Sequence, residues 1–252
     1  SPFVFDSYLQ YVEINRKPQE KFYLPRKKQL LPIVNSLQDL SDDLLDELFI
    51  SLPPRVGKTT LILFFYTWII GKNSELSNLY SAFSDTITNA LYTGILEVIN
   101  DKYTYTWQDV FPTARIASTN ARDETLNIDR VKRYPSMTCR SLYGTLNGAC
   151  DCNGILTADD LIGGIEEALS KDRLIAAWSK TDNNLIPRAK EKAKLVWMGI
   201  RWSMIDPTGR RMELVQNSEE YRNRRCRFIN VPALDSVTDE SNFDYKFGVG
   251  YS

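Results

Sequence analysis

The chain has 252 residues, of which 43% are hydrophobic and 25% are charged, and this balance supports a packed core while excluding collagen-like, low-complexity and fully disordered classes. Its formal net charge is −1, so the surface as a whole should attract nucleic acid little, although a local basic patch is compatible with that value. Histidine is absent, which excludes Ser-His-Asp and Cys-His catalysis and any zinc site with a histidine ligand.

Hydrophobic spacing, turn residues and helix caps predict alternating helices and strands in the first hundred residues. The expected elements are a helix at 27–40, a strand at 48–52, a helix at 58–70, a strand at 79–83 and a helix that ends near residue 99. The helix at 58–70 is apolar on every face and should therefore be buried, with Gly71 as the residue after its C-terminus. Ser84 and Asp85 supply the N-cap of the last of these helices.

The second half of the chain carries further strands, whereas residues 100–135 are polar and give no clear prediction. Strands are expected at 137–142, 154–158, 193–199 and 225–231, with a helix at 165–180. The apolar side of that helix would consist of Ala168, Leu169, Ile175, Ala176 and Trp178. Alternating strands and helices predict an α/β fold with a mainly parallel central sheet and helices on both faces. Residues 1–234 form the expected domain, and 235–252 are typical of a linker or the truncated start of a following domain.

The cysteines and the apolar segments indicate a soluble protein of a reducing interior. Four cysteines lie at irregular spacings, and Cys150 and Cys152 form a CxC rather than the CxxC of zinc ribbons, so free thiols are expected. The longest apolar run, at 61–70, is too short to span a bilayer, and no signal peptide opens the chain.

The strongest functional motif is PPRVGKTT at residues 53–60, between an expected strand and an expected helix. Backbone N–H groups of such a loop, backed by a helix N-terminus, can meet phosphate oxygens. Gly57 would allow close approach, Lys58 would reach the β- and γ-phosphates of ATP, and the Thr59 hydroxyl would ligate Mg²⁺. The residues expected around the nucleotide phosphates are Pro54, Arg55, Val56, Gly57, Lys58, Thr59 and Thr60. Leu52 stands where the first glycine of GxxxxGK(S/T) is expected, and prolines cannot donate, so the donors would come from residues 55–60.

An acidic partner for this loop follows the strand at 154–158. Asp159 would organise the metal, and Asp160 would orient or deprotonate the attacking water. The alternative is an Asp pair that caps a helix, and Asp151 is a weaker competitor for the metal.

Two further segments could contribute to a nucleotide site. The strand that runs from residue 194 into Arg201 and Trp202 could sense the γ-phosphate, or it could be an ordinary buried strand. Gln29 could lie at an adenine edge.

Taken together, these segments resemble the ATPase domain of phage large terminase subunits, the motors that package DNA into proheads. The matching segments are the Gln29 segment at 24–31, PPRxGK(S/T) at 53–59, YGTLNG at 143–148, the strand that ends in Asp159 and Asp160, and the turn at 201–202 with Asp206 four residues on. The resemblance covers nearly the whole chain. It implies a P-loop NTPase fold of the ASCE type, in which another strand separates the Walker A and Walker B strands.

The resemblance also implies the function and the partners. ATP hydrolysis with Mg²⁺ would power translocation of double-stranded DNA, with a portal protein and a small terminase subunit as partners. The chain would be a monomer in isolation and part of a homo-oligomeric ring when assembled, in the host cytoplasm and transiently on the prohead portal. Gly199 and Arg201 would act as coupling or sensor residues, and Arg55 is the candidate catalytic arginine, with Arg140 as another guess.

The chain departs from the family pattern at several positions. Met198-Gly199-Ile200 keeps only the glycine of the coupling motif, and Asn147 stands where relatives often carry arginine. The full subunits of the family also carry a nuclease domain, which does not fit after residue 240, so nuclease activity is not expected in this chain. The alternatives are another ASCE or superfamily 2 helicase-like DNA translocase, or a nucleotide-binding module with little turnover, which Leu52, Asp160 and Met198 favour.

Lys and Arg gather at four places, namely residues 17–28, 130–133, 188–194 and 222–227. Each cluster alone is typical of a solvated face. In a ring of subunits, one modest patch per copy could line a channel and track DNA phosphates without reading sequence.

Overall fold

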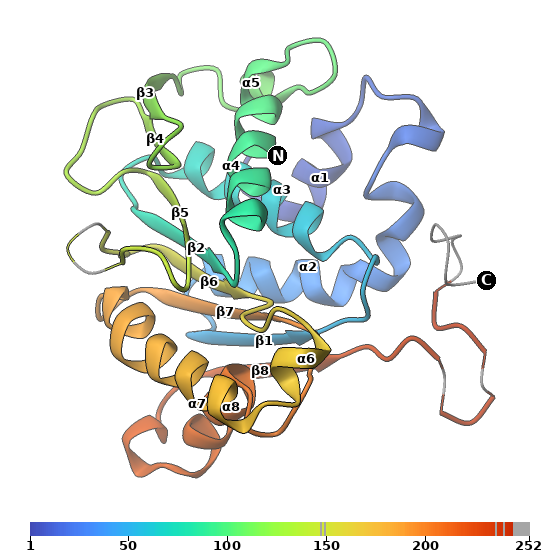
Figure 1. Cartoon of the computed structure of the whole chain (residues 1–252). Helices are drawn as coiled ribbons and strands as arrows, with labels where there is room; N and C mark the ends of the chain where they lie inside the picture. Colours follow the sequence, from blue (N-terminus) through green and yellow to red (C-terminus); the bar gives the residue numbers. More distant parts are fainter. Residues whose placement is uncertain (147, 149, 235, 239, 244–252) are drawn as a thin grey trace.

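The structure is a computed structural model that describes residues 1–146, 148, 150–234, 236–238 and 240–243. An eight-stranded sheet forms its centre, and helices cover both faces (Figure 1). The strands are β1 (Glu47–Ser51), β2 (Asn78–Ala82), β3 (Ile116–Asn120), β4 (Thr125–Ile128), β5 (Met137–Ser141), β6 (Ile155–Asp159), β7 (Lys194–Gly199) and β8 (Cys226–Asn230). The helices are α1 (Phe5–Val12), α2 (Lys27–Ser41), α3 (Lys58–Lys72), α4 (Asp85–Asn100), α5 (Trp107–Val110), α6 (Ile165–Ala168), α7 (Lys171–Lys180) and α8 (Pro207–Asn217). Short helical turns lie at Pro18–Glu20, Leu24–Arg26, Thr181–Leu185, Ile186–Arg188 and Glu219–Tyr221.

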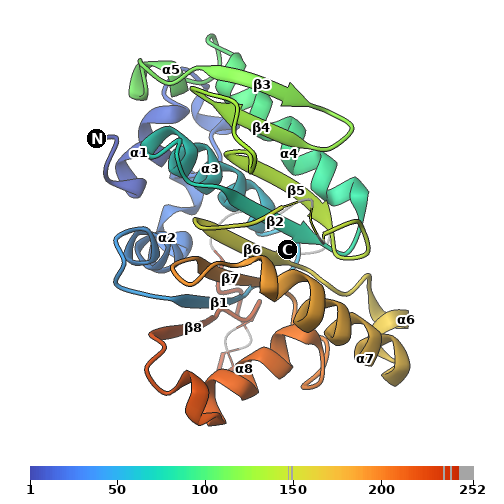
Figure 2. The ribbon, with the colours of Figure 1, turned by 90° about the vertical axis from the view of Figure 1, so that its left-hand side faces the viewer.

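The strand order β3-β4-β5-β2-β6-β7-β1-β8 places β7 between β1 and β6, as Figure 2 shows from β3 at the top to β8 at the bottom. In this sheet the neighbouring strands β5, β2, β6, β7, β1 and β8 run parallel to one another. The β3–β4 hairpin and its pairing with β5 are antiparallel. Ser51 of β1 is in register with Gly199 of β7, and Met198 with Asp159 of β6. The carboxyl ends of these three strands therefore meet at one edge, and the loops that follow them are neighbours.

The two faces of the sheet carry separate hydrophobic cores. Helices α1 to α4 lie on one face and α7 and α8 on the other (Figure 1). Helix α3 is buried nearly all round, as its uniformly apolar sequence predicts, with Phe64, Phe65 and Trp68 packed in the first core. Trp197 and Leu195 of β7 and Leu174 of α7 fill the second core. The predicted mainly parallel α/β sheet, covered on both faces, is confirmed.

The predicted end of the helix at 58–70 is wrong. Gly71 does not follow α3 but lies inside it, since the helix continues to Lys72. A side chain there would meet the Phe111 ring, because a Cβ on Gly71 would lie 2.4 Å from Phe111 Cδ2. The glycine is thus explained by the close approach of helix α3 to Phe111, not by a helix end.

The expected helix at 165–180 is divided into α6 and α7, and its buried side differs from the predicted one. The Ser170 side chain accepts a hydrogen bond from the Arg173 amide and caps α7, which starts a new helix there. The residues that α7 buries are Leu174 and Ala177, whereas Ile175 is exposed. Leu169, which belongs to neither helix, is also exposed. Helix α7 is therefore rotated about its own axis, compared with the orientation that its apolar residues indicate.

Residues 100–135, which carry no clear pattern in the sequence, contain α5 and the β3–β4 hairpin. Strand β3 is half-exposed or exposed along its length, so it lacks the apolar alternation that reveals a strand. The expected strand at 225–231 is confirmed as β8, which pairs with β1 at the other edge of the sheet.

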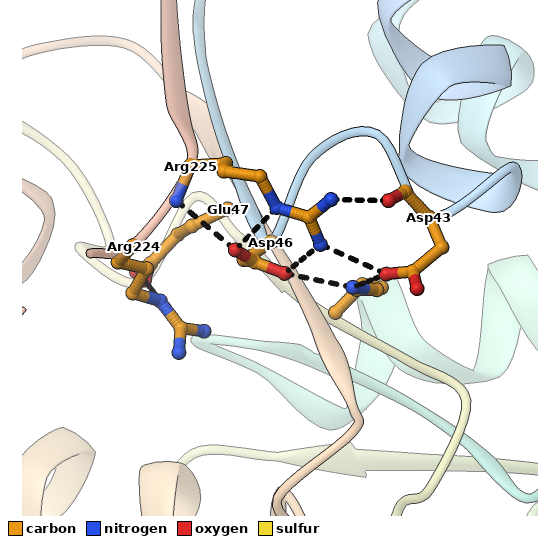
Figure 3. A network of polar contacts seen from close by, with 6 residues as sticks. Asp43, Asp46, Glu47, Arg224 and Arg225 are labelled. Carbon is orange, nitrogen blue, oxygen red and sulfur yellow. Dashed lines mark hydrogen bonds and ion pairs between the residues drawn. The ribbon is translucent and has the colours of Figure 1, made fainter.

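Polar contacts hold this edge together at the start of β1 (Figure 3). The Arg225 guanidinium donates to both carboxylate oxygens of Asp46, at 3.0 and 2.7 Å, and to Asp43. Lys194 of β7 also contacts both carboxylates. The hydrogen bonds from Arg225 hold the pKa of Asp46 below its usual range.

Some described residues beyond 234 pack on this fold. Leu234 and Ser241 form an isolated bridge, and Phe243 is buried in the first core. Within the described part of the chain, no helix is both long enough and apolar enough to cross a membrane. The four cysteines are free thiols, and burial raises the pKa of Cys150 to about 11 and that of Cys152 to about 12.

Candidate functional site

The loop between β1 and α3 is anchored at both ends and turned by two residues with positive φ. Arg55 has a φ of 64° and Gly57 a φ of 93°, and α3 begins at the next residue. Leu52, which replaces the first glycine of the motif, is buried in the core together with Val56. The first amides of α3 have no carbonyl of their own helix to bind, and an anion at this loop could accept from them.

Gly57 is required at its position for a second reason. A Cβ on this residue would lie 2.3 Å from Phe22 Cε2, so the Phe22 ring rests directly on the loop backbone. Phe22 also packs against Phe64 of α3, with ring centroids 6.0 Å apart. The N-terminal segment before α2 is thereby fixed next to the loop.

Gln29 lies in the first turn of α2, shortly after that segment. Its side-chain Oε1 is buried and has no hydrogen-bond partner among the described residues. A buried amide oxygen without a partner is costly, and it is the kind of group that a bound ligand satisfies. The position is compatible with the expected contact to an adenine edge.

The loop lysine and the acidic pair meet across the sheet. Lys58, the first residue of α3, is 7% exposed, and its Nζ lies 2.8 Å from Asp160 Oδ2. These residues are 102 positions apart in the chain. The sequence places both at strand ends, and the strand order β1-β7-β6 brings them together.

Asp160 is also held by the end of β7. Its Oδ1 accepts a hydrogen bond from the Ile200 amide at 2.9 Å, and its own amide donates to the Met198 carbonyl at 2.9 Å. A Cβ on Gly199 would lie 2.6 Å from Asp160 Oδ1, so any larger residue would push this carboxylate away. Asp160 thus connects Lys58 to the segment that leaves β7, and the glycine at 199 makes room for that connection.

Asp159 is buried next to it at the end of β6, with 1% of its surface exposed. The Tyr80 hydroxyl donates to its Oδ2 at 2.7 Å, whereas its Oδ1 has no hydrogen-bond partner among the described residues. Burial, and then the charge of Asp160, raise the pKa of Asp159 to about 7. A buried carboxylate of this kind gains stability from a cation, and a metal would satisfy the free oxygen.

These groups could hold a Mg²⁺ ion together with a phosphate ligand. Mg²⁺ keeps several waters and usually takes one or two protein oxygens besides phosphate oxygens. Asp159 Oδ1 offers one such oxygen, and Thr59 lies exposed in the first turn of α3. Among the described residues no group of three or more Asp, Glu, Cys or His side chains forms a metal cage, so the ion would depend on a phosphate ligand. Asp151 lies before the opposite end of β6, where it pairs with Lys190.

Arg201 lies toward α8, on the face of the sheet opposite to α3. Its guanidinium contacts Met212 Sδ at 2.7 Å and the Ser203 carbonyl at 3.2 Å. Asp206 caps α8 through the Gly209 amide and also accepts from the amides of residues 202 and 203, which orders the Arg-Trp turn. A cavity of about 240 Å³ between β1, β8 and α8 is lined in part by Arg201.

The remaining candidate arginines are separated. Arg55 is exposed in the loop, and Arg140 of β5 pairs with Asp123 at 3.1 Å. The Asn147 position lies outside the described residues.

Sequence reasoning missed Tyr80, which it treated as an ordinary strand residue. The sequence nevertheless contains a clue, because a tyrosine within a fully buried strand needs a partner for its hydroxyl.

Comparison of the chain with protein-family models and with curated proteins gives no match.

Proposed function

We propose that the chain is an ATP-hydrolysing P-loop NTPase of the ASCE type and the motor domain of a phage large terminase. The observation that carries the ATPase proposal is the meeting of Lys58 and Asp160 at 2.8 Å. A lysine at the start of a helix, next to a loop with two positive-φ residues, faces an acidic pair from a strand two places away in the sheet. The separation of β1 from β6 by β7 is the arrangement expected of the ASCE type.

In this proposal each residue has a distinct part in hydrolysis. Lys58 leaves Asp160 and moves to the β- and γ-phosphates of ATP, since a phosphate offers it more negative charge than one carboxylate. Asp160 keeps its contact with the Ile200 amide through Oδ1, and its freed Oδ2 orients water and accepts a proton from it. Asp159 and Thr59 would hold Mg²⁺, which neutralises phosphate charge when bound.

The terminase part of the proposal rests on the motifs at 24–31, 53–59, 143–148 and 201–206. From the resemblance, the substrate that moves is double-stranded DNA, and the partners are a portal protein and a small terminase subunit. The contact of Asp160 with the end of β7 supports a link between hydrolysis and the Arg201 turn, because release of Lys58 alters the forces on that carboxylate.

The competing proposal is a module that binds nucleotide with little turnover. Asp160 favours it to some degree, because its side chain is shorter than the more usual glutamate and is already paired with Lys58. A turnover measurement separates the two proposals.

The test is steady-state phosphate release from ATP by the wild-type chain and by Lys58→Ala. Removal of the charge that meets the phosphates should lower turnover by about 100-fold or more and sharply weaken ATP binding. Lys72→Ala is the matched control, since this lysine ends the same helix and pairs with Asp42. Near-normal turnover in Lys58→Ala would end the P-loop assignment, whereas ATP binding without turnover in the wild type would favour the inert module.

A further inference from the structure

Tyr80 is a buried residue of β2 that reaches the acidic pair from the neighbouring strand. Strands β2 and β6 are parallel, with Tyr80 in register with Thr157 and Ala82 with Asp159. The Tyr80 side chain is fully buried, and its hydroxyl donates to Asp159 Oδ2 at 2.7 Å. The contact therefore joins two strands at the site where the metal would bind.

The two oxygens of Asp159 have different surroundings as a result. Oδ2 is occupied by the tyrosine hydroxyl, whereas Oδ1 is buried without a hydrogen-bond partner among the described residues. An unpaired buried carboxylate oxygen is costly, so the arrangement makes sense where a ligand satisfies Oδ1. A free carboxylate could rotate about its terminal bond, and the hydroxyl fixes which oxygen is left available.

The position of the Tyr80 hydroxyl is itself fixed by packing. The Tyr80 ring meets the Tyr66 ring edge to face, with centroids 6.4 Å apart and an angle of 89°. Tyr66 is anchored in turn, because its hydroxyl donates to the Leu79 carbonyl at 2.9 Å and lies within hydrogen-bond distance of the Thr157 hydroxyl, at 2.7 Å. The hydroxyl that donates to Asp159 is therefore held in place by side-chain packing in the first core.

We propose that Tyr80 is a positioning residue of the metal site, whose hydroxyl holds the Asp159 carboxylate so that Oδ1 is presented to the Mg²⁺ that enters with ATP. This inference rests on the proposed ATPase function. Outer partners of metal-binding carboxylates orient them, and their removal typically costs about 10- to 100-fold in metal affinity or activity. Tyr80→Phe removes only the hydroxyl and keeps the ring that packs on Tyr66.

The experiment measures binding of a fluorescent ATP analogue by the whole chain at increasing free Mg²⁺, and also without Mg²⁺. In Tyr80→Phe the Mg²⁺ concentration that half-maximally strengthens nucleotide binding should rise by about 10-fold or more, with Mg²⁺-free binding unchanged. Tyr8→Phe is the matched control, because it removes a fully buried hydroxyl of the same core that bonds the Thr67 hydroxyl of helix α3 rather than Asp159. Its Mg²⁺ midpoint should equal that of the wild type, and melting temperatures show that both variants fold.

A second comparison isolates the contact from general effects on packing. In an Asp159→Asn background, Tyr80→Phe should produce no further change in the Mg²⁺ midpoint. Equal midpoints in Tyr80→Phe and Tyr8→Phe, or a full additional effect in the Asp159→Asn background, would overturn the positioning role and leave the proposed function intact. Failure of the wild type to bind ATP with or without Mg²⁺ would instead overturn the proposed function, and this inference with it.

Discussion

Asp160 has a contact on each of its two oxygens, and each contact belongs to a different part of the site. Oδ2 pairs with Lys58, while Oδ1 accepts from the Ile200 amide. The backbone of Asp160 has a φ of 39°, a region that Asp tolerates better than most residues. ATP would compete with Asp160 for Lys58, so the same event that binds nucleotide would free a carboxylate oxygen for water.

Asp160→Asn should therefore separate binding from hydrolysis. Loss of the proposed general base should slow phosphate release by about 100-fold or more. Binding of ATP with Mg²⁺ should persist and become tighter than in the wild type, because Lys58 no longer has a charged partner in the empty site. Nucleotide titration and phosphate release on the same preparation check both effects.

Asp159→Asn is the comparison for that variant. It removes the negative charge of the carboxylate whose Oδ1 would meet the metal, so it should weaken the Mg²⁺ dependence of nucleotide binding. If Asp159→Asn keeps Mg²⁺-dependent binding and loses only hydrolysis, while Asp160→Asn does not, the roles of the two carboxylates are the reverse of those proposed.

At the residue scale, the sequence predicted the positions that carry charge but not the groups that hold them. Lys58, Asp159 and Asp160 stand at strand ends, where a pattern of strand, turn and helix indicates them directly. Tyr80 lies on the neighbouring strand β2, 79 residues from its partner Asp159 in the chain. The fit of Gly199 against Asp160 depends on the register of β6 and β7. Neither contact can be predicted from the spacing of residues along the chain.

At the scale of elements, one buried carboxylate joins α8 and β8 to the strand that leads into the loop. Glu47, at the start of β1, is fully buried and pairs with Arg211 of α8 at 2.8 Å. Arg224, just before β8, contacts the same carboxylate, and the Trp197 indole donates to it at 2.6 Å. These contacts fix the α8 face of the sheet relative to β1.

Arg211→Met should lower the free energy of unfolding by about 3 kcal/mol, because it leaves Glu47 buried with only part of its compensation. The value stands at the lower end of what removal of a buried partner costs, since Arg224 and Trp197 still contact the carboxylate. Denaturant unfolding monitored by fluorescence measures the change.

Arg222→Ala serves as the control for Arg211→Met, because Arg222 pairs with Glu219 on the surface, where both side chains are largely exposed. Its effect on unfolding should be small. Equal destabilisation by the two variants would contradict the part assigned to Glu47.

Elements with a strong apolar pattern were predicted well, whereas strand β3 and the boundary between α6 and α7 were not. Helix α3 and strand β7 are buried along most of their length and carry continuous apolar runs. Strand β3 is half-exposed or exposed, so it escaped prediction, and the Ser170 cap that divides α6 from α7 was not recognised. In α7 the apolar residues do not all face the sheet, because Ile175 is exposed while Leu174 and Ala177 are buried.

At the scale of the whole molecule, the alternation of strands and helices predicted the fold class, while the order of the strands had to come from the structure. That order decides the site. Because β7 lies between β1 and β6, the loop before α3 and the acidic pair are close enough for Lys58 to reach Asp160. If β1 lay directly beside β6, the same motifs could be present, but β7 would reach them from a different position in the sheet.

The most direct test of the proposed ATPase site is a crystal structure of the chain with Mg²⁺ and a non-hydrolysable ATP analogue. We expect that Lys58 has left Asp160 for the β- and γ-phosphates, that the metal lies near Thr59 and Asp159 Oδ1, and that the adenine lies next to Gln29. A nucleotide bound elsewhere, with Lys58 and Asp160 still paired, would contradict it.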